Sequence, residues 1–169
     1  MALFGGPAGA GKSTLARAWC ATRAQAAHIE LDQIRSLIIS GRADPQEPSH
    51  LQAAQYRLSV EATCAVARAF TLGGCDVAID DVLEPDAFEH CWRPRLDGLR
   101  WNLIVVLPSL DETLRRSAGR AKRVTEEHVR AQHGRCAAWD EAVRIDTTGL
   151  DVGQSLALAV ARLPERSAR

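Results

Sequence analysis

The chain has 169 residues, of which 46% are hydrophobic and 25% are charged, as expected for one globular domain spanning residues 1–169. Lysine plus arginine equals aspartate plus glutamate, at 21 each, so the net charge favours neither a nucleic-acid partner nor a membrane partner. The five cysteines are scattered and form no C-x-x-C pair, which argues against a zinc site and for a reducing compartment.

The sequence also lacks the features of a membrane or secreted protein. No apolar run reaches the roughly 18 residues that a membrane-spanning helix needs. The N-terminal apolar run, residues 1–4, is short and has no basic flank of the kind found in signal peptides. We therefore expect a cytoplasmic protein that is either a monomer or a homodimer.

Short apolar segments alternate with longer helical patterns along the chain. The expected strands are residues 2–4, 28–31, 76–80, 101–107 and 143–146. The expected helices are residues 13–24, 33–40, 49–72, 109–118, 125–139 and 151–163, with a short helical turn at 86–90. The residues expected to act as helix N-caps are Asp32, Ser49, Ser109, Thr125 and Asp151. This alternation predicts an α/β fold whose parallel sheet is covered by helices on both faces.

The stretch GPAGAGKST, residues 6–14, matches the Walker A pattern in full. Glycines let backbone N–H groups converge on phosphate oxygens, and the following helix directs its positive end at the anion. Lys12 is expected to reach the β- and γ-phosphates of ATP, and the Ser13 hydroxyl is expected to bind Mg²⁺. The residues expected to contact the nucleotide are Gly6, Ala8, Gly9, Ala10, Gly11, Lys12, Ser13 and Thr14.

Acidic residues end two of the expected strands. Asp80 and Asp81 end the third strand, where one carboxylate can serve the metal, or both can simply cap the next turn. We place Asp80 with the metal and Asp81 with the acceptor, while the sequence leaves open which of the two carboxylates serves the metal. Asp32 ends the second strand, and ligands lie over the carboxyl ends of strands in such sheets, so Asp32 is expected to accept the proton of an attacking hydroxyl. Arg35 is expected to pair with Asp32 or an anionic substrate, or to lie on a solvated helix face.

An arginine-rich stretch and one tryptophan complete the expected site. Guanidinium groups on a closing segment neutralise charge that spreads in phosphoryl transfer, which predicts a lid at about residues 115–136. Arg116 and Arg120 are its expected catalytic residues, and Arg116 is also expected to contact ATP. Trp92 fits either the core or the wall of an acceptor pocket, and we include it in an acceptor-binding set together with the region at about residues 33–60.

The motifs GPAGAGKST, ELDQIR, VAIDDV, RRSAGRAKR and IDTTGLDV resemble those of the small P-loop kinases over nearly the whole chain. They are most similar to the branch that contains chloramphenicol phosphotransferase, gluconate kinase and adenylylsulfate kinase. The resemblance implies a three-layer P-loop NTPase fold, strand order 2-3-1-4-5, an arginine-rich lid, and ATP and Mg²⁺ as cofactors. It also implies a base or acceptor-binding role for Asp32 and a position near the adenine for residues 147–150. The acid-glycine-acid signature of adenylylsulfate kinases is absent, and residues 38–55 match no single family.

The sequence leaves three functions open. The leading one is transfer of the γ-phosphoryl group of ATP to a hydroxyl of a small molecule, either a metabolite or an antibiotic. The second is a kinase of nucleic-acid 5′-hydroxyl ends, because polynucleotide kinase domains have a similar Walker A motif and a strand-tip aspartate followed by arginine; the zero net charge argues against it. The third is a nucleotide-binding or ATPase module with no acceptor.

Overall fold

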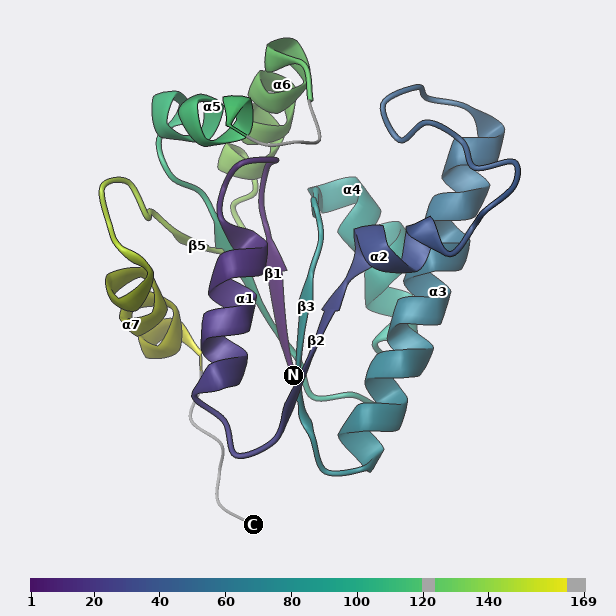
Figure 1. Ribbon diagram of the computed structural model, residues 1–169, viewed down its shortest axis with the longest axis horizontal. Helices are drawn as coiled ribbons and strands as arrows, with labels where there is room; N and C mark the ends of the chain where they lie inside the picture. Colours follow the sequence, from purple (N-terminus) through teal and green to yellow (C-terminus); the bar gives the residue numbers. More distant parts are fainter. Residues whose placement is uncertain (120–123, 164–169) are drawn as a thin grey trace.

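A computed structural model of the chain describes residues 1–119 and 124–163 (Figure 1). Its sheet contains β1 (Ala2–Gly5), β2 (Ala26–Glu30), β3 (Asp76–Asp80), β4 (Asn102–Val106) and β5 (Val143–Ile145). The strand order is β2-β3-β1-β4-β5, and every pair of neighbouring strands is parallel. The expected α/β fold and its strand order are therefore confirmed.

The helices are α1 (Lys12–Ala21), α2 (Leu31–Ser36), α3 (His50–Leu72), α4 (Pro85–Ala87), α5 (Leu110–Ala118), α6 (Glu126–Ala137) and α7 (Val152–Arg162). A π-helical turn, η1 (Phe88–Trp92), and a 3-10 turn, η2 (Arg93–Arg95), follow α4. Four of the expected N-caps are confirmed, because their side chains accept backbone N–H groups: Ser49, Ser109, Thr125 and Asp151. No helix in the described ranges has the length and apolarity needed to cross a bilayer.

The prediction that Asp32 caps a helix at residues 33–40 is wrong. Helix α2 begins two residues earlier, with Glu30 at the N-cap position, and it ends at Ser36. Leu31 is fully buried, and its packing in the core favours a helix that begins at Leu31, directly after β2 ends at Glu30. Asp32 consequently lies in the first helical turn, where its side chain is exposed.

Side chains that alternate along the strands divide the core between the two faces of the sheet. On one face, Phe4 and Ile104 pack with α1 and α7; on the other, Leu3 and Val105 pack with α3, η1 and α6. Figure 1 shows α1 and α7 on one side of the sheet and α3 on the opposite side. The fold therefore has the three layers expected from the sequence.

The register of the strands aligns the ends that carry the acidic residues. Asp80 of β3 lies opposite Phe4 of β1 on one side and opposite Glu30 of β2 on the other. The glycine-rich loop follows β1, while Asp81 follows β3 and α2 follows β2. The loop, Asp81 and Asp32 consequently meet at one edge of the sheet.

Candidate active site

The glycine-rich loop between β1 and α1 requires glycine at specific positions. Gly6, Gly9 and Gly11 have φ values of 134°, 87° and 96°, in the region that side chains other than glycine rarely adopt. A Cβ atom at Gly6 would also lie 2.3 Å from the Val106 carbonyl oxygen of β4. The backbone is thus held in a conformation that places Gly9, Gly11 and the N-terminus of α1 in the lining of one cavity, a position that suits a bound phosphate.

Helices α5 and α6 hold the outer side of this loop. A Cβ atom at Gly9 would lie 2.5 Å from the Thr113 carbonyl oxygen of α5. The buried Gln132 of α6 accepts a hydrogen bond from the Ala8 N–H through its Oε1 at 3.0 Å. The loop is therefore shaped by contacts with residues more than a hundred positions along the chain, and the sequence reading missed Gln132 because a glutamine in a helical pattern carries no signal of its own.

Lys12 and Ser13 begin α1 at the bottom of the loop. Lys12 is 6% exposed, and its Nζ donates a hydrogen bond to the Pro7 carbonyl oxygen at 2.9 Å. The Ser13 hydroxyl donates to the Asp80 Oδ1 at 2.8 Å. A hydroxyl beside a carboxylate is an oxygen donor set that suits Mg²⁺, so the expected pairing of Ser13 with Asp80 fits the geometry.

Two residues of β2, both absent from the sequence-based site, surround Asp80. The His28 Nε2 lies 2.5 Å from the Asp80 Oδ2, and the His28 Nδ1 lies 3.9 Å from Glu30. Glu30 in turn forms an ion pair with Arg17 of α1. His28, Glu30 and Asp80 offer three potential metal-ligand atoms within 4.8 Å of one another. His28 and Glu30 lie two positions apart in β2, so the sequence already indicated that they share one face of the sheet. The register of β2 with β3 is what brings them close to Asp80.

A cavity of about 440 Å³ joins the loop to the acidic strand ends. Its lining contains most of the residues predicted for the site: Gly9, Gly11, Lys12, Ser13, Thr14, Asp32, Asp80, Asp81 and Arg116. In the part of the chain that the structure describes, the other lining residues are Arg17, Glu30 and Val82. The cavity therefore places a phosphate-binding loop, a candidate metal site and two further carboxylates in one space.

Tyr56 orients Asp81 through a hydrogen bond, and Trp92 in turn orients Tyr56. The Tyr56 hydroxyl of α3 donates a hydrogen bond to the Asp81 Oδ2 at 2.7 Å, and the Trp92 Nε1 donates to the Tyr56 hydroxyl oxygen at 3.0 Å. Burial raises the pKa of Asp81 to about 6, and the negative charge of Asp32 adds to the increase. The hydrogen bond from Tyr56 and the positive charge of Lys12 lower the same pKa and offset part of the increase. Burial and the negative charge of Asp81 likewise raise the pKa of Tyr56 well above its ordinary value.

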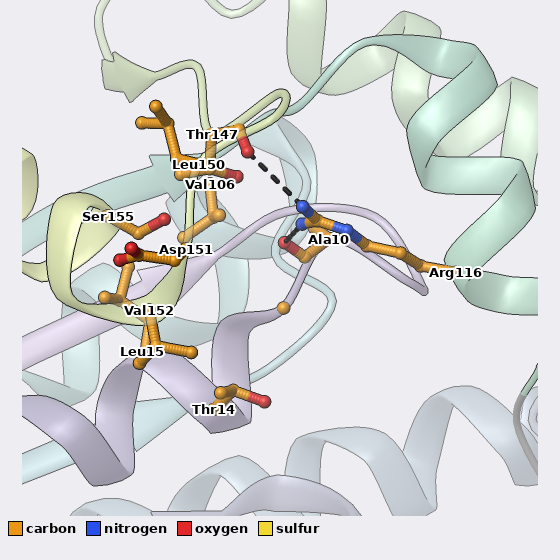
Figure 2. A pocket seen from close by; sticks show the side chains of 11 residues that line it. Ala10, Thr14, Leu15, Val106, Arg116, Thr147, Leu150, Asp151, Val152 and Ser155 are labelled. Atoms are coloured by element: carbon orange, nitrogen blue, oxygen red, sulfur yellow. Dashed lines mark hydrogen bonds between the residues drawn. The ribbon is translucent and has the colours of Figure 1, made fainter.

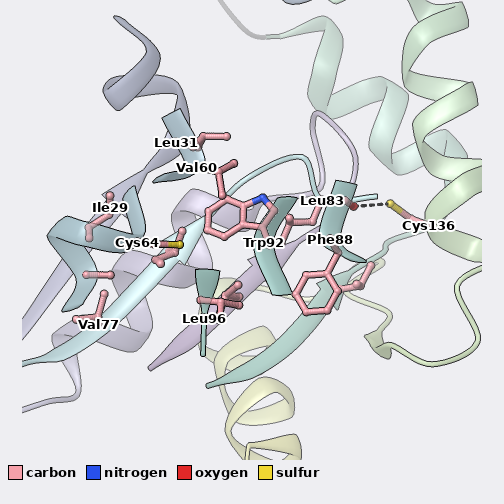
Figure 3. Close-up of a cluster of buried hydrophobic side chains, with 14 of the residues drawn as sticks. Ile29, Leu31, Val60, Cys64, Val77, Leu83, Phe88, Trp92, Leu96 and Cys136 are labelled. Atoms are coloured by element: carbon pink, nitrogen blue, oxygen red, sulfur yellow. Dashed lines mark hydrogen bonds between the residues drawn. The ribbon is translucent and has the colours of Figure 1, made fainter. Parts of the chain in front are cut away.

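Two predicted site residues, Trp92 and Arg35, lie outside the lining of this cavity. Trp92 is 0% exposed and packs among Val60, Cys64 and Leu83, so it does not form a wall of the cavity (Figure 3). The large indole belongs to the core beneath the site, and hydrogen bonds through Tyr56 link it to Asp81 at the cavity. Arg35 is half-buried on α2 and does not line the cavity. Arg120 lies outside the described residues.

A second cavity, of about 230 Å³, shares Gly11, Thr14 and Arg116 with the first, and Figure 2 shows the residues that line it. Its lining includes Val106 of β4, Leu15 of α1, and Thr147 and Leu150 of the segment expected near the adenine. This mixture of apolar side chains with a few polar groups suits a planar heterocycle. Arg116 borders both cavities, and its Nη atoms donate to the Ala10 carbonyl oxygen at 3.4 Å and to the Thr147 carbonyl oxygen at 3.3 Å.

Glu112 orients Arg116 from within α5. Its carboxylate accepts hydrogen bonds from Arg115 and, at 2.6 Å, from the Arg116 Nε. The hydrogen bonds from these two arginines lower the pKa of Glu112 to about 2. Much of the segment predicted as a lid, residues 115–136, is packed on the body of the protein, because Val129, Gln132 and Cys136 of α6 are buried.

The fold is similar to that of several solved structures. The Deinococcus radiodurans tunicamycin resistance protein aligns at a TM-score of 0.69 with 19% identity, over 94% of this chain and 92% of that one. A gluconokinase from Sinorhizobium meliloti 1021 aligns at 0.65 with 13% identity, over 95% and 89% of the two chains. The structure of the Pnkp1/Rnl/Hen1 RNA repair complex aligns at 0.59 with 16% identity, over 80% of this chain and 43% of that one.

These identities are low, so the three likenesses establish the fold of the P-loop kinases and not a substrate. No curated protein gives a significant match to the sequence. The family model described as "AAA domain" matches residues 1–139, which include the glycine-rich loop, Asp32, Asp80, Asp81 and α6. Because the match covers most of the 169 residues, the chain belongs to this AAA domain family of P-loop proteins.

Proposed function

We propose that the protein is an ATP-dependent kinase that transfers the γ-phosphoryl group to a hydroxyl of a small molecule. The observation that carries the proposal is the 440 Å³ cavity, in which the exposed Asp32 shares one space with Lys12 and Ser13. A site that only binds or hydrolyses a nucleotide needs the loop and the metal site. A kinase also needs a proton acceptor beside the reacting phosphoryl group, and Asp32 supplies a carboxylate there.

The donor side of the proposed site consists of the loop and its neighbours. The loop amides and Lys12 bind the phosphates of ATP, while the adjoining 230 Å³ cavity receives the adenine. Ser13 and Asp80 hold Mg²⁺, which neutralises charge on the β- and γ-phosphates when it is bound. Arg116, between the two cavities, stabilises charge on the transferring group, and Arg120 shares this role.

Asp32 acts as the general base on the acceptor side. The acceptor oxygen attacks the γ-phosphorus, the bond from that phosphorus to the bridging oxygen breaks, and ADP leaves with the bond electrons. The hydroxyl proton passes to the Asp32 carboxylate, so charge does not accumulate on the acceptor oxygen. The exposure of Asp32 in the first turn of α2 allows an acceptor to approach it.

The size of the cavity and the balance of charge favour a small acceptor over a nucleic-acid end. The chain carries 21 basic and 21 acidic residues, and four carboxylates of residues 1–119 and 124–163 line the cavity: Glu30, Asp32, Asp80 and Asp81. A polynucleotide kinase has to attract a polyanion beside the reacting hydroxyl, which this lining opposes. A gluconokinase with the same fold is a precedent for a small acceptor. A cytoplasmic monomer or homodimer using the cellular ATP pool fits this activity.

The proposal is tested by transfer of label from γ-labelled ATP in the presence of Mg²⁺. The purified chain is assayed with a panel of sugars, polyols, nucleosides and antibiotics, with a 5′-hydroxyl oligonucleotide and with water alone. We expect at least one small hydroxyl compound to receive the label faster than water does, and Lys12→Ala to abolish the transfer. Label transfer to the oligonucleotide alone, or release of phosphate that no compound accelerates, would contradict the proposal.

A further inference from the structure

We infer that the acceptor is an uncharged compound with two neighbouring hydroxyl groups, which Asp32 and Asp81 recognise together. The inference rests on the proposed kinase function and names the class of its second substrate. One hydroxyl is phosphorylated beside Asp32, while the other donates a hydrogen bond to Asp81. Asp81 is thereby a specificity-determining residue.

The strand register brings the two carboxylates to adjacent positions. Glu30 and Asp80 are paired in the parallel ladder of β2 and β3, so the two strands end at the same level. Asp81 directly follows β3, and Asp32 is the second residue after β2. Both carboxylates line the same cavity. A compound that contacts one carboxylate therefore lies near the other.

The hydrogen bonds behind Asp81 determine what it can bind. The Tyr56 hydroxyl has one hydrogen, which it donates to the Asp81 Oδ2 at 2.7 Å, and the donor that approaches the Tyr56 oxygen at 3.0 Å is the Trp92 Nε1. The two hydrogen bonds therefore run from Trp92 in the core through Tyr56 to the Asp81 carboxylate at the cavity. An ionised carboxylate has about four acceptor sites and no hydrogen to donate. The ionised Asp81, which already accepts from Tyr56 and from the Val82 backbone, therefore has acceptor sites left for a donor on the acceptor compound, such as a hydroxyl.

The charges around the cavity disfavour an anionic acceptor. Within the described part of the chain, the cations that line it are Lys12, Arg17 and Arg116. Lys12 belongs to the phosphate-binding loop, Arg17 forms an ion pair with Glu30, and Arg116 is bonded to Glu112 and to two carbonyl oxygens. Arg35, which could have served an anion, does not line the cavity. Repulsion between like charges about 4 Å apart in a partly hydrated site disfavours an acceptor carboxylate or phosphate by about tenfold or more, which corresponds to roughly 1.4 kcal/mol or more.

The inference is tested with matched neutral and anionic acceptors and with deoxy analogues. D-glucose and D-ribose are compared with D-gluconate and D-ribonate, and with the matching 2-deoxy sugars. Any further acceptor found in the panel described above is treated in the same way. We expect kcat/KM for each neutral acceptor to exceed that of its anionic counterpart by about tenfold or more. Loss of the second hydroxyl is expected to raise the acceptor KM while the KM for ATP changes little.

Two variants distinguish recognition by Asp81 from a structural effect. Asp81→Asn keeps an acceptor oxygen but removes the charge. It is therefore expected to raise the KM for neutral acceptors and to reduce the ratio of kcat/KM between neutral and anionic acceptors. Tyr56→Phe removes the donor that orients Asp81 and is expected to raise the acceptor KM without changing the preference for charge. Asp140→Asn makes the same chemical change on a side chain that is 94% exposed, and it provides the control.

The outcomes separate the inference from the proposed function. If the best acceptors are anionic, or if Asp81→Asn leaves both the acceptor KM and the charge preference unchanged, the kinase function stands and the inference fails. If no compound of either charge receives the phosphoryl group, both the inference and the proposed function fail.

Discussion

The Ser13 hydroxyl donates a hydrogen bond to the Asp80 Oδ1 at 2.8 Å, joining residues that are 67 positions apart in the chain. The bond connects the first turn of α1 to the end of β3, and it brings together two of the side chains that the sequence assigned to a metal. The other Asp80 oxygen contacts His28, so the carboxylate is held on both sides. Asp80 is thus oriented before any ligand arrives.

We predict that Asp80→Asn weakens the response of the enzyme to Mg²⁺. The amide retains an oxygen but loses the negative charge, so the Mg²⁺ concentration needed for half-maximal turnover is expected to rise by about 10- to 100-fold. Titration of activity with Mg²⁺ at saturating ATP measures the effect, with Asp140→Asn as the control. An unchanged titration curve would remove Asp80 from the metal site.

A pair of glycine substitutions tests the shape of the loop. Gly6→Ala introduces a Cβ atom 2.3 Å from the Val106 carbonyl oxygen at a φ of 134°, so it is expected to lower the free energy of unfolding by more than about 1 kcal/mol and to impair nucleotide binding. Gly134→Ala, in α6, meets no atom within 4 Å and is expected to raise the free energy of unfolding by up to about 1 kcal/mol. Urea denaturation of both variants measures the contrast. Equal effects would mean that the loop tolerates a side chain at Gly6.

The hydrogen bond from the Ala8 N–H to Gln132 predicts an effect of α6 on the nucleotide site. Gln132→Ala leaves a buried amide without its partner, and we expect it to lower the free energy of unfolding by about 1–3 kcal/mol and to weaken ATP binding. Gln25→Ala changes an exposed side chain and serves as the control. Calorimetric titration with a non-hydrolysable ATP analogue checks the affinity. If Gln132→Ala loses stability but binds the analogue as the wild type does, α6 does not shape the loop.

The lowered pKa of Glu112 predicts a dependence of stability on pH. Because the arginines lower this pKa from 4.5 to about 2, the ionised carboxylate stabilises the folded state above pH 4.5, and that contribution is lost as the pH falls toward 2. Glu112→Gln is therefore expected to be less stable than the wild type at pH 7, with a difference that shrinks between pH 4.5 and 2. Denaturation across this range measures the difference, with Glu127→Gln as the control. A difference independent of pH would contradict the ion-pair explanation.

Much of the fold could be predicted from the sequence, because its signals are local. Alternating apolar segments and helical patterns indicated every strand, and Ser49, Ser109, Thr125 and Asp151 marked helix starts that the structure confirms. The start of α2 was misplaced because an aspartate after a strand has the same local pattern whether it caps the helix or lies in its first turn. Burial of Leu31, a tertiary effect, decided between the two.

The parts of the site that were missed depend on contacts between distant segments. The missed side chains bond to partners far along the chain: Tyr56 to Asp81 across 25 positions, Gln132 to Ala8 across 124 and His28 to Asp80 across 52. No periodicity in the sequence indicates such pairings. Trp92 was assigned to the cavity because it follows the acidic strand end, yet its indole is buried behind Tyr56. Sequence position therefore predicted acidic residues that the structure brings to one cavity, whereas packing determined which side chains surround them.

The most direct test of the proposed mechanism compares phosphoryl transfer with nucleotide affinity in Asp32→Asn. An asparagine cannot accept the hydroxyl proton, so we expect transfer to the acceptor to fall by about 100-fold or more, while ATP binds as tightly as it does to the wild type and to Asp140→Asn. Normal phosphoryl transfer by Asp32→Asn would contradict the assignment of Asp32 as the base.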